Sequence, residues 1–426
     1  MSTPKVTEVV GGYTFGFEAE GISIKVSRLR LHTSDSRVTG ELQFLSAAGK
    51  PIFPQTSLNF TAERSRTALA KSLTELDSSL PWGDIMNSVS IRVITMARAG
   101  EPVRELDTAL DVPPPEWLLE PLLYKGLPTI IFGEKAVCKS TLSLCIYTCL
   151  ALPWTDNPLG WVAPTRKVKT LLCDYEVDYD VAHYNIKQLQ IGMELPSFSL
   201  YYRRCSIPLA DDVEQLQAHI EKLGAEAIIV DSLGPAVGGD LKDPGTALRF
   251  TSAIRQLKCS ALIIGQTSKD TKSKTKSVFG STFFEYYARN IVEIRKAQEE
   301  GEDSLDIALY NTYHNLGKRF RPMGYHLNFN GTGTHIESQP ITAPELIDRI
   351  GTQARILKLL QTESPLNIAK IAEGLDLKEG NIRVVLGTLR NRGLVIRLGD
   401  KKSGITYARI VKDIVKTPSP DMENEG

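Results

Sequence analysis

The chain has 426 residues, and its 50 basic residues balance 50 acidic ones, so the formal net charge is zero. A hydrophobic content of 42% with 23% charged residues is ordinary for globular protein, and the balance excludes a global field that would attract nucleic acid or membrane. The length leaves room for about two to four domains.

The spacing of the cysteines and the N-terminal residues indicate in which cellular compartment the protein is expected. The six cysteines follow neither a C-x-x-C pattern nor a zinc-ligand spacing, which favours buried thiols in a reducing environment. No basic region followed by an apolar run opens the sequence, and the longest apolar stretch, LSLCIYTCLALPW, is too short to span a bilayer. We therefore expect a cytoplasmic protein without a membrane partner.

Residues 1–110 are expected to form a small α+β domain. The segments YTFGFEAEGISIKVSRLRL and RVTGELQFL alternate apolar and polar residues, as antiparallel strands with one buried face do. Two later segments, SRTALAKSLTEL and WGDIMNSVSIRVITMARAG, carry helical spacing. Residues 111–116 are rich in proline, which predicts a stiff linker.

Residues 117–340 alternate strand-like apolar runs with helical stretches. The runs are PTIIF, KTLLCDY, AEAIIVDS and CSALIIGQT. Near-continuous apolar strands separated by helices predict an α/β fold, in which helices cover both faces of a parallel sheet.

The stretch FGEKAVCKST joins the first of these runs to a helix and has the layout of a phosphate-binding P-loop, with Cys138 in place of the second glycine. In such a loop, backbone N–H groups and the helix N-terminus bind the phosphates. Lys139 would reach the β- and γ-phosphates of ATP, and Ser140 would hold Mg²⁺. The candidate ATP-binding residues are Gly133, Glu134, Lys135, Ala136, Val137, Cys138, Lys139, Ser140 and Thr141. The alternative is a chance Lys-Ser pair between a strand and a helix.

Two acidic residues near strand ends complete a candidate ATPase site. Asp231 ends the run AIIVD, as a Mg²⁺-binding Walker B carboxylate does. Glu176 follows the run TLLCD, where a carboxylate can activate the attacking water. The alternatives are an ordinary apolar strand that ends in Asp and a solvated acidic loop.

A polar residue ends the last of these strands, and lysines follow it. The amide of Gln266 could sense the γ-phosphate of ATP. Lysines in a segment rich in Ser and Thr suit contacts with a DNA backbone. These lysines are Lys269, Lys272, Lys274 and Lys276. A solvated loop is the alternative.

Residues 341–416 read as three short helices followed by two strands, the pattern of a winged helix-turn-helix domain. From residue 353 to residue 416, Lys and Arg outnumber Asp and Glu by seven, which points to DNA. The candidate DNA-binding residues are Asn381, Arg383, Arg390 and Arg392 in the recognition helix, with Lys401 and Lys402 in the wing. A domain for protein contacts is the alternative. Residues 417–426 are expected to be a disordered tail.

The motifs FGEKAVCKST, CDYEVD, IIVDSLGPAVGGD and FGSTFFEYYARNIVEIR together resemble the RecA-like P-loop ATPases, in particular the RepA-like hexameric plasmid helicase branch (AAA_25). The resemblance covers residues 117–340. It implies a RecA-like core and a homo-oligomer, with a hexamer suspected, in which the lysine-bearing loop faces DNA in a central channel. It also implies sensor roles for Gln266 and Arg289. The chain departs from the family at Ala136 and Cys138, where glycines are usual, and at Tyr313, near the place of a basic finger.

These features predict an ATPase that uses Mg²⁺, with Lys139 and Glu176 as its catalytic residues. We expect it to act on DNA as a helicase-like motor in plasmid, phage or mobile-element replication or repair. The alternative is an ATP-gated DNA-binding regulator with little turnover. A left-handed backbone at Cys138 would cost about 1–2 kcal/mol, which weakens a site without abolishing it.

Overall fold

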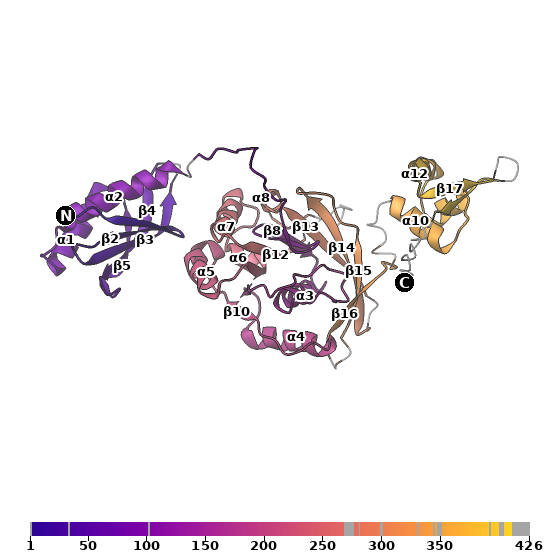
Figure 1. Ribbon diagram of the computed structural model, residues 1–426, viewed down its shortest axis with the longest axis horizontal. Helices are drawn as coiled ribbons and strands as arrows, with labels where there is room; N and C mark the ends of the chain where they lie inside the picture. The colour runs from indigo at the N-terminus through magenta and orange to yellow at the C-terminus, as the bar shows by residue number, and fades with distance from the viewer. Residues whose placement is uncertain are drawn as a thin grey trace, which may run out of the picture. The chain divides into compact units, whose positions relative to one another are not determined.

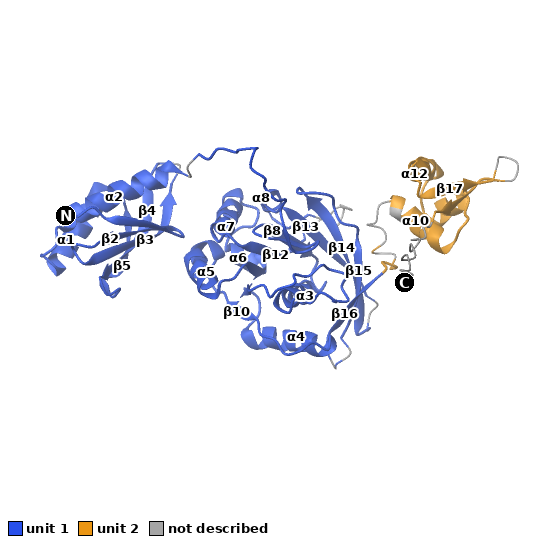
Figure 2. Cartoon of the chain, in the orientation of Figure 1, with its two compact units in different colours: residues 1–339 blue, residues 340–426 orange. Residues whose placement is uncertain are grey.

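The computed structural model describes residues 2–32, 35–100, 103–267, 277–280, 282–298, 301–329, 331, 333–343, 346, 352–391, 393–399 and 404–410. The chain divides into two compact units, residues 1–339 and 340–426 (Figure 2). No helix among the described residues is long and apolar enough to cross a membrane.

The first hundred residues form an antiparallel five-stranded sheet and two helices (Figure 1). The strands lie in chain order: β1 (Lys5–Val9), β2 (Gly12–Phe17), β3 (Ile22–Leu31), β4 (Val38–Ser46) and β5 (Pro51–Asn59). The helices are α1 (Glu63–Leu76) and α2 (Trp82–Ala99). Alternate strand residues, among them Phe15, Phe17 and Phe44, are buried in one cluster with Trp82 of α2. The alternation in the sequence therefore gives one buried sheet face.

A nine-stranded sheet organises the rest of the first unit. Its order is β10-β9-β11-β12-β8-β13-β14-β15-β16, parallel from β10 to β13 and antiparallel from β13 to β16. The strands are β8 (Pro128–Gly133), β9 (Thr170–Asp174), β10 (Tyr201–Arg204), β11 (Ala227–Asp231), β12 (Ser260–Gln266), β13 (Asn290–Ala297), β14 (Ser304–His314), β15 (Met323–Asn328) and β16 (His335–Gln339). A short hairpin, β6 (Trp117–Leu119) and β7 (Leu123–Tyr124), precedes them.

Helices cover both faces of this sheet, which confirms the predicted α/β architecture. The helices are α3 (Lys139–Ala151), α4 (Tyr179–Gly192), α5 (Leu209–Leu223), α6 (Leu233–Val237), α7 (Pro244–Gln256) and α8 (Thr282–Tyr287). Buried residues of α3 and α4 share one apolar cluster, and those of α5 to α8 share the other. Adjacent residues of β8 divide between the two: Ile131 joins the first cluster, and Ile130 and Phe132 join the second. The strand is apolar throughout because both its faces are buried.

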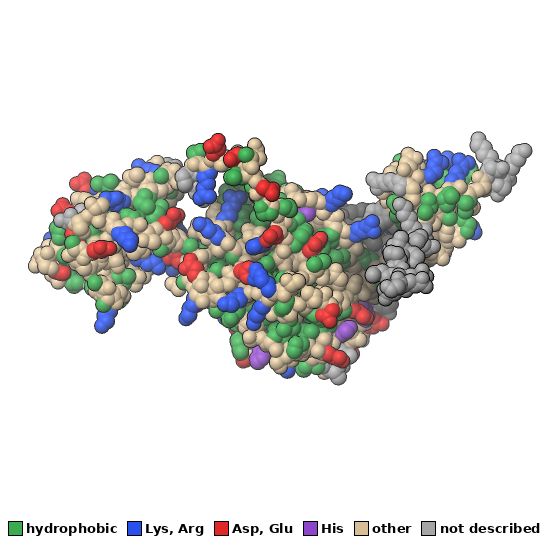
Figure 3. Space-filling model, viewed as in Figure 1, with side chains coloured by type: hydrophobic (Ala, Val, Ile, Leu, Met, Phe, Trp, Pro, Cys, Tyr) green, Lys and Arg blue, Asp and Glu red, His purple; other side chains and the backbone are tan. Residues whose placement is uncertain are grey.

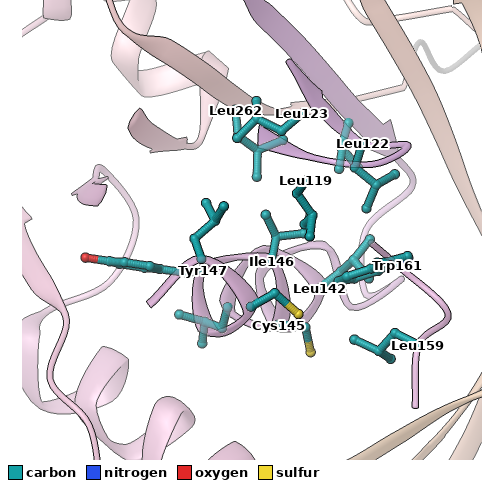
Figure 4. Close-up of a cluster of buried hydrophobic side chains, with 14 of the residues drawn as sticks. Leu119, Leu122, Leu123, Leu142, Cys145, Ile146, Tyr147, Leu159, Trp161 and Leu262 are labelled. Carbon is teal, nitrogen blue, oxygen red and sulfur yellow. The ribbon is translucent and has the colours of Figure 1, made fainter. Parts of the chain in front are cut away.

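Helix α3 lies inside the apolar cluster rather than on the surface. Every residue from Leu142 to Ala151 is buried. Figure 4 shows Leu119 and Leu123 of the β6–β7 hairpin facing Ile146 of this helix. This packing on all sides fixes the position of the N-terminus of α3, where the predicted P-loop ends.

The second unit holds three helices and a two-stranded antiparallel sheet. The elements are α10 (Thr352–Thr362), α11 (Ile368–Leu375), α12 (Glu379–Asn391), β17 (Val395–Leu398) and β18 (Thr406–Arg409). One residue from each element, Ile356, Ile371, Ile382 and Val395, lies in a shared buried cluster that Tyr407 of β18 also contacts. Helical spacing of the apolar residues builds this small core.

The connection from β8 to α3 contains two residues in the left-handed region. The φ angle is 55° at Ala136 and 57° at Cys138. Gly133 has a different constraint, because a Cβ there would lie 2.7 Å from the carbonyl oxygen of Ile294. Space requires glycine at Gly133, whereas Ala136 and Cys138 carry only a torsional cost.

Replacing Cys138 with glycine should therefore stabilise the protein. In the folded state, a residue with a Cβ pays about 1–2 kcal/mol for the left-handed conformation. Glycine avoids this cost, but it loses about 0.5–1 kcal/mol on folding because its unfolded chain has more freedom. We expect Cys138→Gly to melt about 2–4 °C above Cys138→Ala in calorimetry. Cys138→Ala is the matched control, because it removes the thiol and keeps the Cβ. Equal melting temperatures would contradict the left-handed backbone.

Candidate functional site

The predicted site residues meet at one edge of the nine-stranded sheet. Parallel strands place their carboxyl ends together, and ligands bind outside that edge in open α/β sheets. Asp231 at the end of β11 pairs in register with Asp174 at the end of β9. Gln266 at the end of β12 pairs with Gly133 at the end of β8. Strand β12 lies between β8 and β11, so the loop and Asp231 are one strand apart.

Lys139 begins helix α3 and folds back over the loop. Its ammonium donates hydrogen bonds to the carbonyl oxygens of Gly133, at 3.2 Å, and Glu134. Burial lowers the pKa of Lys139, and the negative charges of Asp231 and Glu176 oppose that shift. Neutral carbonyl oxygens leave the lysine charge unneutralised, so the ammonium can bind a phosphate.

The other loop residues differ in exposure. Glu134, Lys135 and Ala136 are exposed, while Val137 is buried against α3. Cys138 is partly buried, and burial raises the pKa of its thiol. The thiol of Cys138 is therefore neutral, and the residue lies at the N-cap of α3.

Ser140 and Asp231, the two predicted Mg²⁺ ligands, lie on neighbouring elements. Ser140 is exposed in the first turn of α3, Asp231 is buried at the end of β11, and α3 contacts β11. Burial raises the pKa of Asp231 to about 6, and the charges of Glu176 and Asp174 raise it further, against the Ser140 side chain and the charge of Lys139. A hydroxyl beside a carboxylate short of positive charge suits Mg²⁺, which takes few protein ligands and completes its shell with phosphate and water.

Glu176 is held by two residues that sequence reasoning did not select. The Asp174 carboxylate accepts the backbone N–H groups of Glu176 and Val177, both at 2.9 Å. The Ser232 hydroxyl donates to the Glu176 carboxylate. An Asp at a strand end followed by a turn is a recognisable signal for Asp174, whereas Ser232 follows Asp231 in sequence and has no signal of its own. The exposed Glu176 is thus oriented at the edge where Asp231 ends its strand.

Gln266 lies beside the loop, and the lysines after it cannot be placed. Its in-register partner is Gly133, and the N–H of the next residue, Thr267, donates to the Gly133 carbonyl at 3.2 Å. The predicted DNA-contacting residues Lys269, Lys272, Lys274 and Lys276 lie outside the described residues.

Arg289, for which the resemblance implies a sensor role, lies beside the first residue of β8. Strand β13 runs parallel to β8, with Asn290 beside Thr129 and Ile294 beside Gly133. The Arg289 N–H donates to the carbonyl of Pro128, the first residue of β8, at 3.0 Å. The length of β8 therefore separates Arg289 from the loop of its own chain.

A cavity of about 230 Å³ adjoins the start of α3, and sequence reasoning missed it. Thr141 lines it from α3, and Tyr184, Asn185 and Gln188 line it from α4. Phe329, which follows β15, lines the opposite wall. The connection between β15 and β16 is fastened to α4 by the Thr334 N–H, which donates to the Gln188 carbonyl at 2.9 Å.

The candidate DNA-binding residues of the second unit are exposed on α12. They are Asn381, Arg383 and Arg390, whereas Arg392, Lys401 and Lys402 lie outside the described residues. Arg383 pairs with Glu379 on its own helix at 3.3 Å. Figure 3 shows lysine and arginine side chains gathered on one face of this unit.

The comparison with protein families agrees with the ATPase interpretation of the core. Residues 97–272 match the AAA_25 family model, described as an AAA domain, and this span includes the loop, Glu176, Asp231 and Gln266. No curated protein matches the chain. A solved structure, that of a KaiC-like protein from the archaeon Pyrococcus horikoshii OT3, aligns over 56% of this chain and 100% of its own at 11% identity, with a TM-score of 0.36. The AAA_25 match supports an ATPase-type domain over residues 97–272, which are less than half of the chain.

Proposed function

We propose that this chain binds ATP with Mg²⁺, hydrolyses it, and uses hydrolysis to act on DNA. The observation that carries the ATPase part is the meeting of Lys139, Ser140, Glu176 and Asp231 at one sheet edge, beside a loop that leads into a buried helix. Each of these four side chains has a separate task in phosphoryl transfer to water.

The resting contacts of these side chains define what each would do. Lys139 would exchange its two carbonyl partners for the β- and γ-phosphates. Ser140 and Asp231 would hold Mg²⁺, which neutralises charge on the phosphates. Glu176, held by Ser232 and by the turn at Asp174, would accept a proton from the attacking water.

The cavity next to Thr141 is a candidate site for the adenine base. Its volume of about 230 Å³ accommodates a planar ring. Tyr184 and Phe329 offer aromatic surfaces, and Asn185 and Gln188 offer amide groups that can donate or accept hydrogen bonds. The cavity begins at α3, directly after the phosphate loop, as an attached base requires.

The action on DNA rests on charge and on the arrangement of the second unit. Three helices followed by a hairpin fit a winged helix-turn-helix domain, with α12 as its recognition helix. The excess of basic residues between 353 and 416 favours a polyanion over a protein partner. A hexameric helicase-like motor in plasmid, phage or mobile-element replication follows from the resemblance alone.

An ATP-gated DNA-binding regulator with little turnover is the second candidate. The left-handed Ala136 and Cys138 favour it, because they strain the loop that must hold the phosphates. The location of Arg289 favours it too, because the length of β8 separates Arg289 from the loop of its own chain.

Lys139→Ala should weaken ATP binding about 10- to 100-fold, because hydrogen bonds between charged groups contribute about 1.5–3 kcal/mol each. Isothermal titration calorimetry with ATP and Mg²⁺ measures the loss. Lys125→Ala is the matched control, because Lys125 is exposed and pairs with Glu116 at the other end of β8. Equal affinities for both variants would overturn the nucleotide site.

Glu176→Gln should bind ATP as the natural chain does while its turnover falls about 10²- to 10⁴-fold, because the amide cannot accept the water proton. Phosphate release, measured with and without single-stranded DNA, tests this. Glu221→Gln, on the exposed side of α5, is the control. Wild-type turnover as slow as that of Glu176→Gln would favour the regulator over the motor.

Mg²⁺-dependent ATP binding should weaken as pH falls below about 6. The Asp231 pKa is raised from 3.8 to about 6, so the carboxylate that binds Mg²⁺ is lost about tenfold per pH unit below that value. Without Mg²⁺, the raised pKa of Asp231 affects the free energy of unfolding in the opposite direction. Its stabilising contribution is complete below pH 3.8 and is lost as the pH rises through about 6. Calorimetry from pH 5 to 7.5 measures the binding term, and Asp231→Asn corrects for titration of ATP. Identical pH profiles for both proteins would contradict this role of Asp231.

A further inference from the structure

Strand β13 extends past the end of the P-loop strand. Ile294 of β13 lies beside Gly133, the last residue of β8. Because β13 continues to Ala297, its last three residues run alongside the connection between β8 and α3. Lys296 is one of these three residues.

The alternation of side chains places Lys296 on the loop side of the sheet. Ile294 faces that side: its Cβ would lie 3.4 Å from a Cβ at Gly133, and it shares a buried cluster with Val137. Lys296 follows Ile294 by two residues and has the same orientation. Arg295 and Glu293 face the other side, where their side chains form an ion pair at 2.7 Å.

The described residues offer Lys296 an amide partner and no carboxylate partner. Its ammonium donates to the amide oxygen of Gln298 at 3.2 Å, and no ion pair among the described residues includes it. Lys296 is half-buried and lies two residues beyond Ile294, the partner of Gly133, so its charge is available just past the end of β8.

We propose that Lys296 is a second phosphate-binding lysine of the nucleotide site, contacting the phosphate chain beside Lys139. This inference rests on the proposed ATP binding and adds a residue from a strand outside the P-loop motif. A second cation offsets the strain of Ala136 and Cys138, because its attraction to the phosphates does not depend on the loop torsions. Half-burial strengthens that attraction relative to a fully solvated lysine.

Two variants at one position test this role. Lys296→Gln keeps the length of the side chain and removes its charge, whereas Lys296→Arg keeps the charge. We expect Lys296→Gln to weaken ATP and ADP binding about 10- to 100-fold in calorimetry and to leave adenosine binding unchanged. Lys296→Arg should retain most of the affinity, and the salt dependence of ATP binding should be shallower in Lys296→Gln.

The outcomes separate this inference from the proposed function. Natural protein that fails to bind ATP overturns the proposed function itself. Natural protein that binds ATP while Lys296→Gln binds it equally well overturns only the role of Lys296. Equal losses for the Gln and Arg variants, or an equal loss for adenosine, would show a structural effect and also overturn it. Lys125→Gln controls for the loss of a surface charge.

Discussion

The site depends on one buried carboxylate, that of Asp231. Burial at the edge of a parallel sheet disfavours its charge, and two further acids, Asp174 and Glu176, add to the negative field. The protein offsets this only in part, through the Ser140 side chain and the charge of Lys139. A divalent cation bound at Ser140 and Asp231 would complete the compensation, since a buried charge is stable only when it is paired. The same imbalance supports the proposed binding of Mg²⁺ with ATP at this edge.

The positions of glycine and non-glycine residues in the loop follow two different physical costs. At Gly133 a Cβ would lie 2.7 Å from a backbone carbonyl oxygen, which cannot move without displacing β13. At Ala136 and Cys138 the cost is torsional and local, of order 1–2 kcal/mol each. The chain has glycine at Gly133, where a Cβ would not fit, and has larger residues at Ala136 and Cys138, where the cost is only torsional. A P-loop poor in glycine is therefore compatible with an intact phosphate site.

Sequence reasoning located the parts of the site that depend on strand ends. Apolar runs that end in Gly133, Asp231 and Gln266 could be assigned to one edge, because parallel strands align their carboxyl ends. The sensor role of Arg289 stays a prediction: the spacing of residues along the chain does not reveal which end of β13 is nearer the loop, and Arg289 lies beside the first residue of β8. The cavity beside Thr141 was missed because α4 and the residues after β15 form it, and only the folded sheet brings them together.

Hydrogen bonds connect the ends of β8 and β12 with the described residues on both sides of residues 268–276. Before these residues, the Thr267 N–H donates to the Gly133 carbonyl, and after them, the Phe279 N–H donates to the Gln266 carbonyl at 2.7 Å. Thr267 and Val278 also form an antiparallel bridge. If Gln266 senses the γ-phosphate as proposed, these hydrogen bonds connect that residue with Thr267 and Phe279, the described residues on either side of residues 268–276.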